Sequence, residues 1–181
     1  MTGVAGSGGA ATTPVKADLH LHTSEDPRDA IDYSAEDLLA RAAGLGFGVI
    51  AITLHGKTLA SERLTALARE LGILLIPSVE LRLEGCDVVA WNVSADEADS
   101  LRTFDQLRKL RSRRGQSMMT MAPHPFYLLG GSIGRRLLRE LDCFDAIEYC
   151  HFRTRLIDPN RRAAALAAKT GLPLVATSDA H

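Results

Sequence analysis

The segment DLHLHTSEDP, residues 18–27, is the most informative stretch of this chain. It overlaps a predicted strand, Val15 to His22, and places His20 and His22 two positions apart. Side chains alternate between the two faces of a strand, so both imidazoles lie on the same side and can hold one cation. An HxH pair is a weak signal by itself, and its weight depends on what the rest of the chain places near it.

Outward from this segment, short apolar runs alternate with amphipathic stretches, the pattern of βα units around a largely parallel sheet. About seven strands are predicted: 15–22, 49–54, 73–79, a hairpin that turns at Glu84-Gly85, 118–122, 146–150 and 174–177. The run 73–79 is apolar throughout, which suits burial on both faces. Predicted helices follow the N-cap Ser34, span 59–71, extend from Ser94 to about Arg114, and begin near Ser132 and Pro159.

Composition limits the class of protein. The chain has 181 residues, a net charge of -1 and 46% hydrophobic residues, which fits one folded domain over 15–181 after a Gly/Ser/Thr/Ala-rich mobile tail at 1–14. The near-neutral charge gives no nucleic-acid signal but allows a small anionic substrate. Three cysteines without a CxxC pair, no apolar run of membrane-spanning length and no signal peptide predict a cytoplasmic protein with no membrane partner. Nothing in the sequence indicates the oligomeric state.

Metal-ligating side chains fall at or just after the predicted strand ends. The set consists of all six histidines of the chain and two carboxylates: His20, His22, His55, His124, His151, His181, Glu80 and Asp179. In a βα barrel these ends converge on one face, where the active site forms. Asp179 and His181 repeat the two-residue spacing on the last strand, which neighbours the first in a closed barrel. Nitrogen and carboxylate ligands without thiolates suit Zn, Mn or Fe.

These motifs resemble a known family. DLHLHTSEDP (18–27), ITLH (52–55), PSVEL (77–81), APHP (122–125) and TSDAH (177–181) are similar, in order, to the motifs of the PHP (polymerase and histidinol phosphatase) metal-dependent phosphoesterases. The resemblance spans about 18–181. It implies an α/β fold, a distorted (β/α)7 TIM-like barrel with two or three divalent metal ions. Family members continue with a further helix, so we expect the chain to be truncated at its C-terminus.

The resemblance also assigns the ligands by position. The first metal would take His20, His22, Glu80 and Asp179; the second would share Glu80 and take His124; the third would take Asp26, His55 and His181. Two departures stand out. The family usually has TDH where this chain has Thr53-Leu54-His55, and Cys86-Asp87-Val88 stands near the place of a further histidine of the second site.

A paired metal centre predicts phosphate-ester hydrolysis by a hydroxide that bridges two cations. Asp179 and His151 are the predicted catalytic residues, with His151 protonating the leaving oxygen. Three cations near strand ends, Lys57, Arg153 and Arg155, are candidate phosphate ligands or ordinary solvated loop charges. The basic run 108–114 is interpreted as a solvated helical face, and Trp91 as a packed residue.

Three functions remain open. The first is hydrolysis of a small phosphate monoester or a nucleotide. The second is a zinc amidohydrolase, which also begins with HxH and ends with a catalytic Asp; this chain lacks a candidate for a carbamylated lysine at a strand end. The third is a non-catalytic PHP-like module that keeps its metal, which Leu54 and the abrupt end favour.

Overall fold

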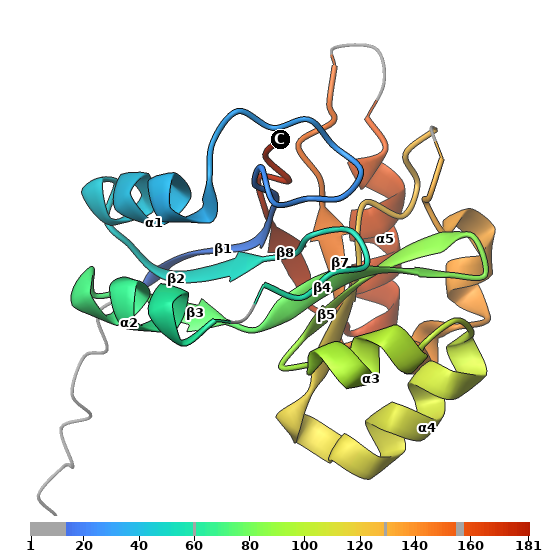
Figure 1. Ribbon diagram of the computed structural model, residues 1–181. Coiled ribbons are helices and arrows are strands. Elements are labelled where there is room, and N and C mark those ends of the chain that lie inside the picture. The colour runs from blue at the N-terminus through green and yellow to red at the C-terminus, as the bar shows by residue number, and fades with distance from the viewer. Residues whose placement is uncertain (1–13, 60, 129, 155–157) are drawn as a thin grey trace, which may run out of the picture.

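The computed structural model describes residues 14–59, 61–128, 130–154 and 158–181, so nearly all of the predicted tail lies outside the described residues. Its strands are β1 Lys16–Leu21, β2 Phe47–Ile52, β3 Leu74–Ile76, β4 Ser78–Leu83, β5 Cys86–Trp91, β6 Met119–Ala122, β7 Ala146–Tyr149 and β8 Leu174–Ala176. Its α-helices are α1 Ala35–Gly44, α2 Glu62–Glu70, α3 Ala95–Ser100, α4 Phe104–Arg114 and α5 Asn160–Thr170 (Figure 1).

The strands form two sheets. β1, β2 and β3 pair in parallel, and the second sheet runs in the order β4-β5-β6-β7-β8, with parallel pairing between β6, β7 and β8. The pairs β4·β5 and β5·β6 are antiparallel. Two isolated parallel bridges, Leu21 to Ala180 and His55 to Glu80, join the sheets. Leu21 ends β1, His55 and Ala180 follow β2 and β8, and Glu80 lies within β4. The fold is therefore mixed α/β, with bridges in place of a continuous ladder between the sheets.

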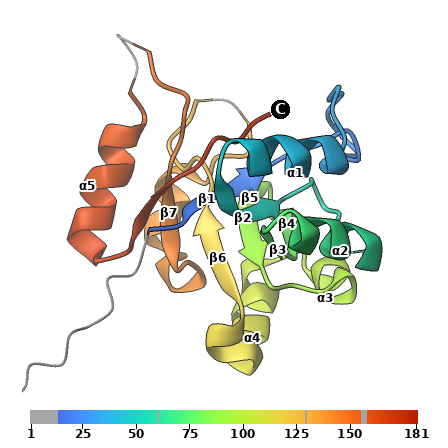
Figure 2. The same ribbon diagram turned by 90° about the vertical axis from the view of Figure 1, so that its left-hand side faces the viewer.

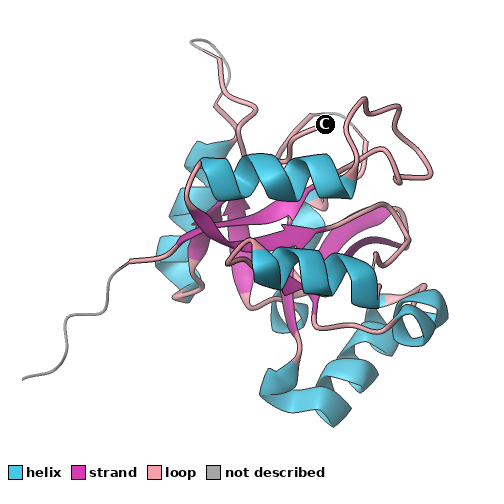
Figure 3. Cartoon of the chain, turned by 60° about the vertical axis from the view of Figure 1, so that its left-hand side comes forward, coloured by secondary structure: helices cyan, strands magenta, loops and turns pink. Residues whose placement is uncertain are grey.

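Apolar side chains gather in three clusters. α1 and α2 cover the three-stranded sheet around Leu39 and Leu54, and α3, α4 and α5 cover the five-stranded sheet around Leu107 and Ile147 (Figure 2). A third cluster around Met121 lies between the two sheets. The helices lie outside and the strands inside (Figure 3), which leaves the carboxyl ends of the strands as the face where loops gather.

Local sequence signals account for most element boundaries. Ser34 accepts a hydrogen bond from the backbone of Asp37 and forms a capping box, as predicted. The region after Ser94 is two helices and not one, because the backbone is extended at Leu101 and Thr103 caps a new helix. The predicted hairpin is confirmed. Glu84 and Gly85 both have positive φ, 48° and 86°, which matches the right-handed twist of the strands on either side.

Two predicted elements differ from the structure. No α-helix begins near Ser132 in the described residues. The segment after it forms two short 3-10 turns, Gly134–Leu138 and Leu141–Cys143. The predicted strand 73–79 is divided at Pro77, which has no N–H to donate to a ladder. Leu74 in β3 is 62% exposed, so the prediction of burial on both faces is wrong for an edge strand.

β1 has an irregularity that directs its histidines. Asp18 pairs with Ile50 and Leu21 with Ile52, so β1 uses one more residue than β2 over this interval. Such a bulge rotates the side chains that follow it. His20 and His22 are both fully buried, while Leu21 packs with Leu39 and Leu54 against the helices.

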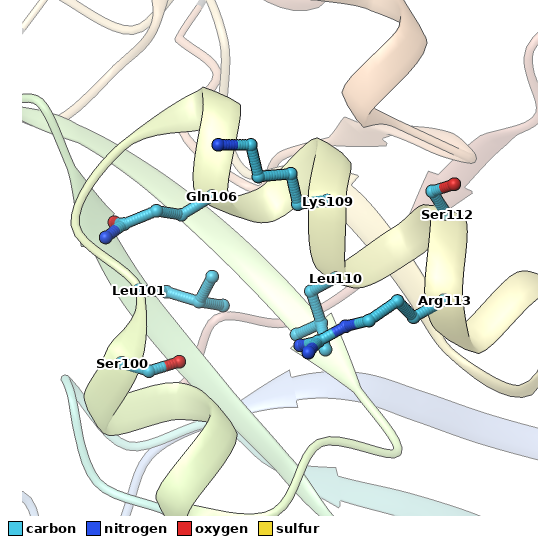
Figure 4. A pocket seen from close by; sticks show the side chains of 7 residues that line it. All are labelled: Ser100, Leu101, Gln106, Lys109, Leu110, Ser112 and Arg113. Carbon is cyan, nitrogen blue, oxygen red and sulfur yellow. The ribbon is translucent and has the colours of Figure 1, made fainter.

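Three of the five basic residues in the run 108–114 of α4 form ion pairs. Arg108 contacts Asp142, Arg111 contacts Asp145 and Arg114 contacts Glu97. The two remaining basic residues border a shallow pocket between α3 and α4 (Figure 4), whose lining consists of Ser100, Leu101, Gln106, Lys109, Leu110, Ser112 and Arg113. The prediction of a solvated face therefore fails for the three paired arginines.

No helix within the described ranges is long and apolar enough to cross a membrane; α4 and α5, for example, have 11 residues each. Trp91 is buried, and its indole N–H donates to the carbonyl of Leu19 at 3.0 Å. The prediction that Trp91 packs in the sheet is thus confirmed.

The capping box of α1 gives the first testable prediction. Ser34→Ala removes the acceptor for the Asp37 N–H, so we expect the free energy of unfolding to fall by about 1 kcal/mol. Urea denaturation measures this change. Ser100→Ala, which alters an exposed hydroxyl near the end of α3, is the matched control and should change stability by less than about 0.5 kcal/mol. An equal loss in both variants would contradict the assignment of the cap.

Candidate metal centre

The structure brings the eight predicted metal ligands into one contact network at the carboxyl ends of the strands. They come from β1 and β4, from the loop after β1, and from the residues that follow β2, β6 and β8: His20, His22, Asp26, His55, Glu80, His124, Asp179 and His181. His22 and His181 are thus neighbours in space. The two bridges between the sheets lie at this place, since one involves Ala180 and the other involves Glu80.

The carboxylate of Glu80 lies at the middle of the network and is 2% exposed. Its Oε2 is 3.4 Å from Nε2 of His20, 3.3 Å from Nε2 of His22 and 3.2 Å from Nε2 of His55. Its Oε1 is 3.3 Å from Nε2 of His124. The two oxygens therefore face different groups of imidazoles, as a carboxylate shared between two cations would.

Asp179 is the second carboxylate of this cluster. Its Oδ1 lies 3.2 Å from Nε2 of His20 and 3.4 Å from Nε2 of His22. Asp179 has a φ of 46° and His124 a φ of 70°, a region that side chains rarely occupy. Such conformations cost free energy and tend to gather at functional sites. Both residues adopt them where their side chains enter the cluster.

Asp26 ties the loop after β1 to the end of β2. Its Oδ2 is 2.9 Å from Nδ1 of His22 and accepts the backbone N–H of His55 at 2.9 Å. The same oxygen is 3.1 Å from Nδ1 of His55. Asp29, which the sequence interpretation missed, lies 3.2 Å from His55 and 3.2 Å from His181. It lies in a loop, where no periodicity marks it.

His181 is the most exposed member of the network. Its ring stacks on that of His22, with centroids 4.3 Å apart and planes at 17°. Its Nε2 contacts Asp29, and its Nδ1 is 3.9 Å from Oδ1 of Asp179. The residues predicted for a third metal are therefore adjacent, on the solvent side of the buried cluster.

The cluster contains buried polar atoms that have no hydrogen bond among the described residues. Four of these atoms belong to predicted ligands: His22 Nε2, Glu80 Oε1, His124 Nδ1 and Asp179 Oδ1. Three of them lie within ion-pair distance of a neighbour without hydrogen-bond geometry. Leaving buried polar groups unsatisfied costs about 1–3 kcal/mol each, so this concentration of atoms needs an explanation.

Divalent cations fit this donor set. Within the network, three groups have ligand atoms within 4.8 Å of one another: His20, His22 and Asp179; His20, Glu80 and His124; and His22, Asp26, Asp29 and His55. A fourth group, Glu140, Asp142 and Cys143, lies outside the network. Nitrogen and oxygen donors without thiolates match Zn, Mn or Fe. A bound cation would satisfy the atoms that lack hydrogen bonds.

Without a cation, the network is a set of charged pairs. Burial lowers the pKa of His22, but the carboxylates of Asp179, Glu80 and Asp26 outweigh burial and raise it to about 9. Burial alone would raise the pKa of Glu80, yet the adjacent histidines hold it well below its usual range. The pKa values of Asp26 and Asp179 are lowered in the same way, against burial, chiefly by the adjacent imidazole of His22.

Other predicted residues lie outside the network. His151 is exposed, and its ring lies against Phe152 with centroids 4.0 Å apart. Lys57 donates to the carbonyl of Glu25 at 3.0 Å, and Arg153 donates to the Tyr149 hydroxyl at 3.3 Å. Arg155 lies outside the described residues. The roles of these residues remain predictions.

The two departures from the family motifs have structural explanations. Leu54 is fully buried in the core under α1 and α2, while Asp26 contacts His55. Asp87 is paired with Arg82 at 2.7 Å and is not a member of any candidate ligand group in the described residues. Neither position therefore adds a ligand to the network.

Comparisons with known proteins bear on the fold. A family model described as PHP-associated matches residues 158–181, which include α5, β8, Asp179 and His181. No curated protein matches the chain. A proposed metal-dependent phosphoesterase from Bifidobacterium adolescentis has a similar structure, with a TM-score of 0.69 and 13% identity over 93% of this chain and 88% of that one. An amidohydrolase from Chromobacterium violaceum, solved with bound sulfate and no metal, has a TM-score of 0.64 and 15% identity over 92% and 88%.

The raised pKa of His22 gives a pH prediction for the metal-free protein. A raised folded pKa contributes stability that is complete below about pH 6.5 and is lost as the pH rises to about 9. We expect this loss to be about 3 kcal/mol. The lowered pKa values of Glu80, Asp26 and Asp179 contribute stability that is lost as the pH falls below about 4.

Urea denaturation in the presence of a chelator, at pH 5.5, 7.5 and 9, measures the alkaline effect. His22→Gln should reduce the decline between pH 6.5 and 9, and the part that remains should come from His20 and His124, whose pKa values the adjacent carboxylates also raise against burial. A wild-type stability that stays constant over that interval would contradict the charged-pair description.

The burial of Leu54 gives a second prediction. Leu54→Asp restores the acidic residue of the family motif but places a carboxyl group in an apolar core. We expect it to destabilise the protein by more than Leu54→Ala, for which about 2–5 kcal/mol is typical. Urea denaturation measures both variants, and zinc titration of the folded fraction tests for a new ligand. Tighter zinc binding by Leu54→Asp would show that position 54 reaches the metal centre.

Proposed function

We propose that this chain, whose assignment to the PHP family is supported by the match at 158–181 and by its fold, is a metal-dependent hydrolase of phosphate esters. The observation that carries the proposal is Glu80, whose two buried oxygens face separate imidazole groups. A shared carboxylate at a cluster of histidines is the arrangement that paired-metal hydrolysis needs. We also propose that the two bridged sheets are parts of a distorted (β/α)7 barrel.

In this proposal the ligands keep the assignment made from the sequence. One cation takes His20, His22, Glu80 and Asp179; a second shares Glu80 and takes His124; a third takes Asp26, His55 and His181. Bound divalent cations supply Lewis acidity, which neutralises charge on the phosphoryl oxygens and makes water more acidic.

The chain's own residues would orient these ligands and handle protons. Asp26 accepts from Nδ1 of His22, which leaves Nε2 of that ring directed toward Glu80 and Asp179. His151 is exposed after β7, where an imidazole can donate a proton to a leaving oxygen. We propose Lys57 and Arg153, both exposed, as ligands of the substrate phosphate.

The likeness to the C. violaceum amidohydrolase favours a second candidate function, hydrolysis of a cyclic amide. The bound sulfate of that structure is a tetrahedral anion like phosphate, so the same neighbour is compatible with a phosphate site. The only lysine near the network, Lys57, donates to the Glu25 carbonyl and makes no contact with the ligand set in the described residues. A carbamylated-lysine centre therefore has less support than a phosphoesterase centre.

Purified protein should contain transition metal and release phosphate from an aryl phosphate. His22→Ala and Asp179→Ala should each lower this activity by at least about 100-fold, because both remove a ligand. Lys109→Ala, a change of an exposed residue on α4, is the control and should leave the activity unchanged.

The substrate panel separates the candidates. Elemental analysis measures the bound metal, and a malachite-green assay measures phosphate release. Hydrolysis of lactams and ureides is measured on the same protein. Turnover of the cyclic amides alone would select the amidohydrolase. Metal binding that raises the melting temperature, with no turnover of any substrate, would select a non-catalytic module.

A further inference from the structure

Glu148 lies directly behind the first histidine of the cluster. It belongs to β7 and is completely buried. Its Oε1 is 2.8 Å from Nδ1 of His20, and the same oxygen accepts the hydroxyl of Thr177. An ionised carboxylate can only accept hydrogen bonds, so it pairs with the imidazole when the proton is on Nδ1.

The contact determines which nitrogen His20 offers to the cluster. With Nδ1 bound to Glu148, Nε2 points to Oε2 of Glu80 at 3.4 Å and to Oδ1 of Asp179 at 3.2 Å. A carboxylate behind a metal-bound histidine fixes the ring orientation and makes the ligand nitrogen more basic. His20 has the geometry of such a pair.

Glu148 also connects the first and last strands. Thr177 follows β8 and lies two residues before Asp179, whose backbone N–H donates to the carbonyl of His20 at 3.0 Å. Asp18 accepts the backbone N–H of His20 at 3.4 Å and that of Ser178 at 3.2 Å. Glu148 thus binds the ring of His20, and Asp18 binds its backbone. Each of these two carboxylates also binds a residue just before Asp179, Thr177 or Ser178.

The surroundings of Glu148 differ from those of a structural ion pair. Glu140, another buried carboxylate, is bound by Arg108 and Arg136. Across the described ranges, no lysine or arginine lies within ion-pair distance of Glu148, and its second oxygen has no hydrogen bond. Burying a carboxylate without a paired lysine or arginine destabilises the fold, so stability alone does not explain Glu148.

We propose that Glu148 is a positioning residue of the metal centre: it sets the tautomer and orientation of His20 so that Nε2 binds the cation shared with Asp179. The proposal rests on the proposed metal-dependent function. It adds a residue that no ligand motif contains, and it predicts an effect on metal affinity that is separate from turnover.

Zinc affinity, measured by competition with a chelator, tests the proposal. Glu148→Ala should weaken binding by about 10- to 100-fold. Glu148→Gln keeps an acceptor oxygen for Nδ1 and should restore most of the affinity. Asp145→Asn is the matched control, since it alters a half-buried carboxylate that is paired with Arg111 away from the centre and should leave zinc affinity unchanged.

A second measurement follows the ring itself. In two-bond 1H–15N spectra of zinc-loaded protein, His20 should carry hydrogen on Nδ1 in the wild type and in Glu148→Gln, and this pattern should be lost in Glu148→Ala. If Glu148→Ala fails to fold, Thr177→Val, which removes the hydroxyl that shares Oε1, should weaken zinc binding by several-fold.

The outcomes separate the two proposals. A wild type that binds no zinc would overturn the metal-dependent function and this inference with it. A wild type that binds zinc, with Glu148→Ala or Thr177→Val binding equally well and the His20 spectrum unchanged, would overturn the role of Glu148 alone.

Discussion

The carboxylate of Glu80 is the interaction on which the rest of the centre depends. It is almost completely buried, and four imidazoles lie within 3.4 Å of its two oxygens. A charge removed from water is tolerated only where opposite charges or cations surround it. The elements that carry these imidazoles must therefore end at the same place. The backbone bridge between His55 and Glu80 reflects this requirement, because it joins two sheets that otherwise pair separately.

Much of this arrangement could be predicted from residue order alone. His20 and His22 share a face because strands alternate, and Asp179 and His181 follow the last strand in the same spacing. Ser34 and Ser94 predicted helix starts because their hydroxyls satisfy free backbone N–H groups. These signals are local, and they operate in the same way in any fold.

The remaining features depend on contacts between distant segments. The hairpin at Glu84 reverses the chain, so β5 runs opposite to β4. β5 is also antiparallel to its other neighbour, β6. Leu54 stands where the family motif has an acidic residue, and its side chain packs into the core under α1 and α2. Glu148 is marked by no spacing rule, because its partner His20 is 128 residues away.

The bridge between Leu21 and Ala180 means that segments synthesised far apart in time share one centre. Ribosomes add about 5–20 residues per second, so roughly 10 to 30 s separate the synthesis of His20 from that of Asp179. Until the later segment emerges from the exit tunnel, the nascent chain lacks one of the carboxylates that balance the imidazoles of the first strand. A cation held by the complete ligand set would therefore be captured only after residue 179 has emerged, and it would hold that segment against β1.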